Sequence, residues 1–528
     1  MNRFDVIIIG AGHNGLTCAC YLAQAGLSVL ILERQDVAGG AAITEEFHPG
    51  FRNSVASYTV SLLNPKVIKD LQLARHGLEI RSRPAANFLP CDDGPGLLIK
   101  NTLEETQQEF RRLSEADADA LPGYYDMLDD VAQVLRDRVL KTPPKAGGPL
   151  VQWLDVIKMS RQFKRLTLGR QRDLLGLFSK SASEVLDQWF EHPQIKAAFA
   201  FDAVVGNYAA PSTPGSAYVL LHHVFGEVNG RTGAWGHAVG GMGAITQAMA
   251  KRAQELGVTV RLNAPVKSVV ANTGRCSGVT LADGETFNAR AVASNVNPKL
   301  LYQRLIDQNL LSQDFRRAIN AYRCGSATFR MNVALNELPN FRCRPGVEQQ
   351  LHHQAGIVMA PDMEYLERAF LDARLYGWSR QPIVEMLIPS TVDSSLAPAG
   401  KHVASLFCQH FDPQLPDGAS WQDKREEAAD LIIGTVNRWA PNFASSVLGR
   451  QILSPADLES RFGLIGGDIF HGALGVDQLY SARPLLGYAD YRGPIHGLYH
   501  CGSGAHPGGG VTGAPGHNAA REIIKDLK

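Results

Sequence analysis

Residues 10–15, Gly-Ala-Gly-His-Asn-Gly, have the glycine spacing of a turn that binds a dinucleotide. Gly10 permits a tight turn, Gly12 lets the backbone approach a pyrophosphate, and Gly15 lets the next helix pack against the preceding strand. Glu33 follows at the distance where a carboxylate accepts hydrogen bonds from the ribose hydroxyls. These residue types predict a site for an adenine dinucleotide, with its phosphates at the start of a helix.

A second glycine pair, Gly39-Gly40, follows the acidic residue after a short loop. This pattern is typical of flavoproteins of the glutathione-reductase and amine-oxidase type, in which it continues the site for the ADP half of FAD. Many such proteins have an arginine directly after the pair, whereas this chain has Ala41-Ala42. The phosphate contact is therefore expected to be absent or to come from Arg34 or Arg52.

A third glycine-rich stretch lies near the carboxyl end, at residues 502–513. Glycine costs backbone entropy, so a cluster this dense needs a structural reason. Leu498 to Cys501 predicts a short strand, and a helix is expected from about Ala514, with Pro515 in its first turn. Such a unit can return beside a bound flavin, where Gly502 would let the backbone pass the second phosphate and the ribityl chain.

The elements that position the first motif form a strand, a helix and a second strand. Val6 to Ile9 is a continuous β-branched run, as expected of a buried parallel strand. Residues 16–25 have helical apolar spacing that ends at Gly26, and residues 27–32 are apolar again. The motif thus has the context that a dinucleotide site requires.

The middle of the chain predicts a further part of the same sheet. Residues 244–256 predict a helix, and residues 258–262 and 264–270 predict strands. A hairpin with an Asp-Gly turn at 283–284 is expected next, followed by a separate strand at 291–295. In this arrangement Val266 would offer its backbone groups to the adenine.

The fold class that these elements predict is α/β, with a Rossmann-like FAD-binding domain and a discontinuous α+β substrate or cap domain. The FAD-binding domain is expected to comprise residues 1–82, 229–299 and 465–528. The cap is expected to comprise residues 83–228, which look helical with loops, and residues 300–464. The second of these segments contains expected strands such as Thr328 to Leu335.

Composition excludes several other classes of protein. The 528 residues are 45% apolar and carry no formal net charge, so no global field would hold nucleic acid. The eight cysteines include no C-x-x-C pair and no zinc-ligand spacing, and we expect no metal site. Cys18 and Cys20 lie on different faces of the first helix and cannot readily form a bridge. The sequence therefore does not predict disulfide reductase chemistry. No G-x-S-x-G motif supports a serine hydrolase.

Residues 153–180 interleave apolar side chains with lysines and arginines. A basic amphipathic helix of this kind can lie on an anionic membrane surface. It can equally be a cap helix with a solvated basic face, and both interpretations stay open here. No apolar run in the sequence is long enough to span a bilayer.

The sequence names no acid–base pair with which a substrate would react. Four polar residues are candidates for lining a flavin pocket, and each has an ordinary structural role as its alternative: His506, His223, Tyr208 and Arg231.

The motifs together resemble the phytoene desaturase, carotenoid isomerase and retinol saturase group of FAD enzymes. Residues 466–472, 477–484 and 499–520 narrow the resemblance to the branch of pyridine nucleotide-disulfide oxidoreductase domain-containing proteins. The resemblance implies FAD as cofactor and hydride transfer to or from an apolar, lipid- or polyene-like substrate. The cofactor-binding residues that it and the motifs indicate are Gly10, Gly12, His13, Asn14, Gly15, Glu33, Arg34, Gly39, Gly40, Val266, Gly502 and Val511.

Two further interpretations are kept beside this one. The chain could be a flavin-binding scaffold that regulates a protein partner, or forms a homo-oligomer, with little turnover of its own. It could also be an amine oxidase, which would need an aromatic cage beside the flavin. The expected location is the cytoplasm of a bacterium, or the mitochondrial matrix for a eukaryotic protein with a cleaved leader.

Overall fold

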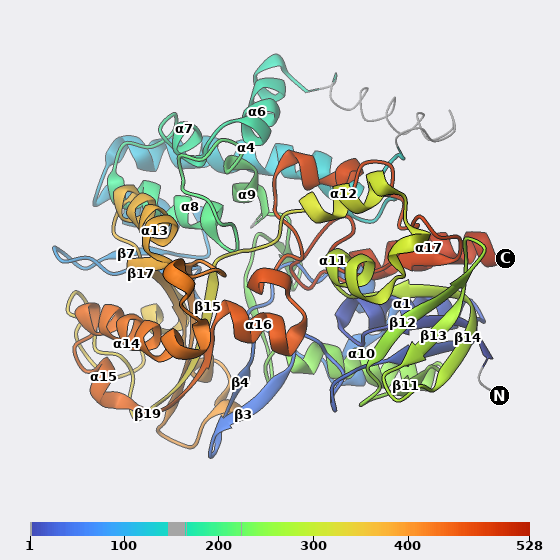
Figure 1. Ribbon diagram of the computed structural model, residues 1–528. Coiled ribbons are helices and arrows are strands. Elements are labelled where there is room, and N and C mark those ends of the chain that lie inside the picture. The colour runs from blue at the N-terminus through green and yellow to red at the C-terminus, as the bar shows by residue number, and fades with distance from the viewer. Residues whose placement is uncertain (1–2, 146–163, 165, 223) are drawn as a thin grey trace.

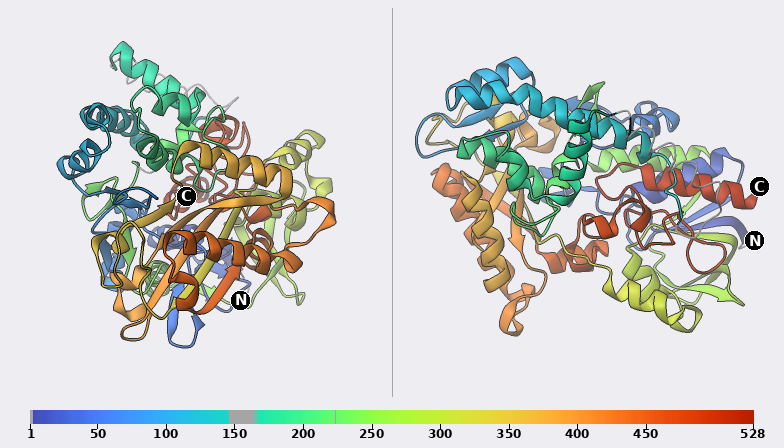
Figure 2. Two further views of the ribbon diagram at one scale, coloured as in Figure 1. Left: turned by 90° about the vertical axis from the view of Figure 1, so that its left-hand side faces the viewer. Right: turned by 90° about the horizontal axis from the view of Figure 1, so that it is seen from above.

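The structure is a computed structural model that describes residues 3–145, 164, 166–222 and 224–528. His223 and residues 153–163 and 165 of the basic segment 153–180 lie outside the described residues. Two large sheets, each covered by helices, make up the described part of the chain, and both termini lie at the same end of the molecule (Figures 1 and 2).

The first sheet contains the dinucleotide motif. Its path is β11-β2-β1-β14-β13-β12, and β20 pairs with the last three residues of β14. The strands are β1 (Arg3–Ile9), β2 (Val29–Leu32), β11 (Thr259–Arg261), β12 (Val266–Asn272), β13 (Arg275–Leu281), β14 (Thr286–Ser294) and β20 (Leu498–His500). The predicted strands near residues 286 and 291 are one strand, which is a correction. β14 is continuous because it pairs with β1 from Asn288 to Ser294.

Successive side chains of β1 point to opposite faces of this sheet, and helices cover both faces. Val6 and Ile8 pack against α1 (His13–Gln24), α10 (Gly243–Glu255) and α17 (Ala514–Leu527). Ile7 and Ile9 pack on the opposite face, against a cluster that includes Phe315 of α12 (Gln313–Ala321). This period of two requires apolar residues at every position of the strand, which explains the unbroken β-branched run.

The second sheet follows the path β19-β15-β18-β17-β16-β6-β7. Its strands are β6 (Asn87–Leu89), β7 (Leu97–Ile99), β15 (Thr328–Leu335), β16 (Gly356–Met359), β17 (Trp378–Leu387), β18 (His402–Phe411) and β19 (Val447–Leu453). The prediction of a strand from Thr328 to Leu335 is confirmed. The helical prediction for residues 83–228 missed β6 and β7, because strands of three residues are too short to show a period.

Helices cover both faces of the second sheet. Ile383 packs with α13 (Met363–Tyr376) and the helices above it, whereas Val384 packs with α14 (Trp421–Trp439) on the other face. The upper layer in Figure 1 consists of α3 (Leu103–Arg111), α4 (Glu115–Val139), α6 (Leu168–Ser179), α7 (Ala182–Leu186), α8 (Pro193–Val204) and α9 (Ala217–His222). None of the described helices combines the length and apolar character needed to cross a bilayer. The domain boundaries given above stay a prediction.

Candidate functional site

A cavity of about 270 Å³, called the nucleotide cavity below, lies at the carboxyl ends of β1, β2 and β14. In an open parallel sheet this edge is where ligands bind. Seven predicted cofactor-binding residues line the cavity: Gly10, Gly12, His13, Glu33, Arg34, Gly40 and Val266.

The three glycines of the first motif lie where a side chain would meet strain or close neighbours. Gly10 has a φ of +95°, and a Cβ on Gly15 would lie 2.3 Å from the Gly10 carbonyl oxygen. A Cβ on Gly12 would lie 2.7 Å from the Asn295 side-chain nitrogen. Gly12 caps α1 without a side-chain hydrogen bond, and no acidic residue lies in the first turn. The first N–H groups of α1 therefore suit a phosphate.

Glu33 is buried in the wall of the nucleotide cavity, with 5% of its surface exposed. Its Oε2 accepts a hydrogen bond of 2.7 Å from the Ala11 amide, and its Oε1 accepts one of 3.0 Å from the Gln35 amide. A carboxylate has about four acceptor positions, so these two bonds fix its orientation and leave capacity for two ribose hydroxyls.

The other predicted cofactor-binding residues support the cavity without lining it. The Asn14 side chain donates to the Ser503 hydroxyl over 3.1 Å, and the Gly39 amide donates to the Ala11 carbonyl over 3.0 Å. A Cβ on Gly502 would lie 2.5 Å from the Asn295 carbonyl oxygen, so glycine is needed here for the approach of two chain segments. Val511 is buried, with a left-handed φ of 57°.

Two residues of the cavity wall have buried ring nitrogens without a partner. Nε2 of His13 and Nδ1 of His471 are buried without a hydrogen-bond partner, and both residues line the nucleotide cavity. The cavity therefore combines a ribose acceptor, a free helix start and unpartnered ring nitrogens, which fits the ADP half of FAD. Arg34 lines the cavity but donates to the carbonyl oxygen of Arg461 over 2.6 Å. Arg52, the other expected phosphate ligand, is exposed and lies outside the lining.

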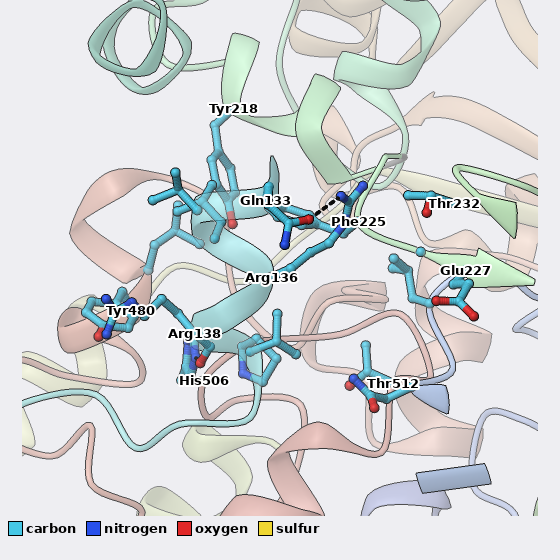
Figure 3. A pocket seen from close by; sticks show the side chains of 18 of the residues that line it. Gln133, Arg136, Arg138, Tyr218, Phe225, Glu227, Thr232, Tyr480, His506 and Thr512 are labelled. Carbon is cyan, nitrogen blue, oxygen red and sulfur yellow. Dashed lines mark hydrogen bonds between the residues drawn. The ribbon is translucent and has the colours of Figure 1, made fainter. Parts of the chain in front are cut away.

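A second cavity of about 790 Å³, called the apolar cavity below, lies between the upper helices and the loop that precedes α17 (Figure 3). Its wall comes from residues 62–65, the end of α4, α6, α9, residues 225–227, Thr232 and the carboxyl-terminal loop. Its apolar side chains include Leu62, Leu63, Val134, Leu135, Val139, Leu174, Phe178, Phe225 and Leu479.

His506 is the one described catalytic candidate that lines the apolar cavity. Its Nε2 lies 3.1 Å from the carbonyl oxygen of Arg138, so this nitrogen carries the proton in the neutral ring. Burial lowers the pKa of His506 to about 4, and the hydrogen bond to Arg138 opposes this effect only in part. Tyr480 packs edge-on against the imidazole, with ring centroids 5.2 Å apart.

Two other candidates, Tyr208 and Arg231, lie away from both cavities. The Tyr208 hydroxyl donates to Asp412 over 2.7 Å, and the Arg231 guanidinium donates to the Asn101 carbonyl over 2.6 Å. Neither residue lines either cavity. The hydrogen bond to Asp412 orients the Tyr208 side chain, and the hydrogen bond to Asn101 orients the Arg231 side chain. His223 lies outside the described residues.

The sequence interpretation missed a buried charged cluster between the two sheets. Glu385 of β17 accepts a hydrogen bond from Tyr58, and Arg330 of β15 donates to the Ala56 carbonyl over 3.0 Å. Arg330 also lies over the Tyr58 ring, 4.4 Å from its centroid. The available signal was a single charged residue inside an otherwise apolar strand, as in Thr-Phe-Arg-Met and Ile-Val-Glu-Met.

The close pair of cysteines on α1 is buried within the first core cluster. Cys18 and Cys20 are buried and free, and burial raises the pKa of the Cys20 thiol to about 12. A thiol with this pKa stays protonated at neutral pH and is a poor nucleophile. Among the described residues, no group of three His, Cys, Asp or Glu side chains is arranged to hold a metal ion.

Comparisons with known proteins agree with this site. Residues 15–329 match the family described as flavin containing amine oxidoreductase. The chain is 42% identical to pyridine nucleotide-disulfide oxidoreductase domain-containing protein 2 of Rattus norvegicus, covering 100% of this chain and 94% of the relative. It is 27% identical to a lycopene-forming phytoene desaturase of Pseudescherichia vulneris, covering 99% of both chains.

A solved structure of an oxidoreductase from Methanosarcina mazei has the same fold. It is 16% identical, with a TM-score of 0.62, and the match covers 99% of this chain and 100% of the other. The predicted fold class and the resemblance to the phytoene desaturase group are thereby confirmed. The chain belongs to the flavin containing amine oxidoreductase family and is an FAD-dependent oxidoreductase.

Proposed function

We propose that the protein transfers hydride between FAD and an apolar, lipid- or polyene-like substrate that occupies the apolar cavity. The observation that carries this proposal is a space of about 790 Å³ with a mainly apolar wall, bounded in part by the glycine-rich loop that precedes α17. Bound FAD supplies the hydride chemistry, and the protein supplies binding and orientation.

The residues around the apolar cavity would exclude water and orient the substrate. Leu174 and Phe178 of α6 form part of the cavity wall. His506 and Thr512, which belong to the loop before α17, form another part of it (Figure 3). Because Nε2 of His506 donates to a carbonyl, its Nδ1 is the nitrogen that can accept a hydrogen bond or a proton. The phytoene desaturase relative acts, by its name, on a long polyene, which supports an apolar substrate for this chain.

Anaerobic titration tests the proposal directly. Polyenes, fatty-acyl compounds and primary amines are added separately to the holoprotein, and flavin absorbance near 450 nm is followed. We expect bleaching by one of the apolar classes. Leu174→Trp should block this bleaching because the larger side chain fills the cavity. Leu175→Trp is the matched control, since Leu175 is the next residue of α6 and is 62% exposed.

Each other outcome assigns a different function. Bleaching by amines alone would identify an amine oxidase. Firmly bound flavin that no compound reduces would favour a flavin-binding scaffold that acts through a protein partner. Equal inhibition by Leu174→Trp and Leu175→Trp would show that the apolar cavity does not hold the substrate.

Peripheral membrane contact belongs to the same proposal, because an apolar substrate partitions into lipid. Leu168 and Leu175 of α6 are 63% and 62% exposed, on the helix that also lines the apolar cavity. Flotation with anionic vesicles tests this contact, and loss of flotation in a Leu168→Ser, Leu175→Ser variant is the expected result. Flotation equal to that of the parent would contradict it. The cytoplasmic location stays a prediction that cell fractionation tests.

A further inference from the structure

Both arginines that line the nucleotide cavity already have partners. Arg34 donates to the carbonyl oxygens of Arg461 and Ser460, over 2.6 and 3.3 Å. The Arg461 guanidinium binds the Glu45 carboxylate through both of its terminal nitrogens. Beyond the N–H groups at the start of α1, a diphosphate in this cavity therefore needs other side-chain donors, since the alanines after Gly40 have none.

Two histidines of the cavity wall have ring nitrogens available for that role. His13 is the first residue of α1, and its Nε2 is buried without a partner. His471 comes from the loop after Phe470, and its Nδ1 is likewise buried and unpartnered. Both residues line the nucleotide cavity, as does Ser503, whose hydroxyl accepts from Asn14. An unmade hydrogen bond at a buried nitrogen is costly, so these atoms indicate a ligand.

The charged and titratable groups around this pair include His500, Arg483, Asp468 and Tyr322, whose hydroxyl donates to the His471 carbonyl over 2.7 Å. Arg483 is fully buried and donates to backbone carbonyls, including those of Phe470 and Ser503 over 2.6 and 2.9 Å. Asp468 accepts from the Gly325 and Phe470 amides. Burial lowers the pKa of His13 to about 3, that of His471 to about 4 and that of His500 to about 3. The histidines are thus neutral in the protein without ligand.

We propose that His13 and His471 donate ring N–H groups to the diphosphate of FAD, in place of the arginine that follows the glycine pair in other flavoproteins, and that FAD binding is coupled to proton uptake. Two phosphate charges within hydrogen-bond distance favour the protonated imidazoles and raise their pKa. The loaded protein then holds more protons than the empty protein at pH values between the two pKa values. FAD affinity therefore falls as the pH rises through the pKa of the loaded state. This inference rests on the cofactor and does not depend on the proposed substrate.

Calorimetry on the full-length protein from which FAD has been removed tests the proposal. ADP-ribose carries a diphosphate without a group that titrates near neutral pH, and adenosine lacks the diphosphate. Each is titrated between about pH 6 and pH 8, in two buffers of different ionisation enthalpy, so that proton uptake is counted. We expect proton uptake with ADP-ribose and none with adenosine.

Three variants separate a contact with the diphosphate from a structural role. His13→Leu should weaken ADP-ribose binding about tenfold or more and leave adenosine unchanged, as expected for loss of a charge-assisted hydrogen bond. His13→Gln keeps a donor, so it should retain most of the affinity and lose part of the proton uptake. His402→Gln, in a half-buried histidine that lines neither cavity, is the matched control.

The results that would overturn the proposal are equally specific. If the parent protein takes up no proton with ADP-ribose, the proposal is overturned. This test needs no variant, so it remains valid even if His13→Leu fails to fold. Equal weakening of ADP-ribose and adenosine by His13→Leu would assign His13 a structural role. A protein whose flavin none of the apolar compounds bleaches, but which binds ADP-ribose with proton uptake, would contradict the proposed substrate and leave this inference intact.

Discussion

The Tyr58 hydroxyl donates a hydrogen bond of 2.5 Å to Oε2 of Glu385, although the two residues are 327 positions apart in the chain. Tyr58 follows the hairpin of β3 (Thr44–His48) and β4 (Phe51–Ser54), and Glu385 lies in β17 of the second sheet. Burial raises the pKa of both groups. This bond therefore ties the segment that continues from the nucleotide cavity to the second sheet.

We predict that Tyr58→Phe lowers the free energy of unfolding by about 1–3 kcal/mol, because Glu385 stays buried and loses its donor. Tyr208→Phe is the matched control, since it removes a tyrosine–carboxylate bond to Asp412, which is less buried than Glu385. We expect a smaller loss there. Urea unfolding of both variants measures the difference, and equal losses would contradict the prediction.

Glu33→Gln should weaken FAD binding about tenfold to a hundredfold, because an amide offers one acceptor oxygen where the carboxylate offers two. The remaining oxygen cannot serve both the Ala11 and Gln35 amides and still accept from ribose hydroxyls. Fluorescence titration of the protein after FAD removal measures the affinity. Glu104→Gln, at an exposed position in the first turn of α3, should bind FAD as the parent does.

Gly15→Ala should abolish FAD retention and destabilise the fold, because its Cβ would lie 2.3 Å from the Gly10 carbonyl oxygen. Separation of α1 from the turn would displace the N–H groups that face the cavity. Gly434→Ala, within α14, meets no atom within 4 Å and should stabilise the protein by about 0.5–1 kcal/mol. The flavin-to-protein absorbance ratio and thermal unfolding test both variants. A yellow, stable Gly15→Ala protein would refute this interpretation of the turn.

The nucleotide cavity was largely predictable from the sequence, whereas the apolar cavity was not. Gly10 to Glu33 form one local unit, so spacing along the chain determines spacing in the fold. The apolar cavity joins segments as distant as Leu62 and Thr512, and its shape depends on how helices pack. The same limit applies to Tyr58 and Glu385, because the strand pattern gives no indication of which distant residue each side chain meets.

Acid should destabilise the protein between about pH 6.5 and pH 4. Burial lowers the pKa of His410 and His500 to about 3, whereas histidines of an unfolded chain titrate near 6.5. The unfolded state therefore binds more protons in this range, and the free energy of unfolding falls as the pH is lowered. His410→Phe should make this dependence shallower, and His496→Phe, at an exposed position, should not. Melting temperatures measured across the range test the difference, and parallel curves for the parent and His410→Phe would contradict it.

The first sheet closes only with residues that lie far along the chain from its first strand. β20 pairs with β14, and α17 packs so tightly on α1 that a Cβ on Gly516 would lie 2.1 Å from the Asn14 carbonyl oxygen. The glycine turn leaves the ribosome early but lacks these neighbours until residues 498–527 have been translated. We therefore expect FAD capture only after residues 498–527 have been made, and a nascent chain stalled before residue 498 would expose an unfinished nucleotide site to chaperones and proteases.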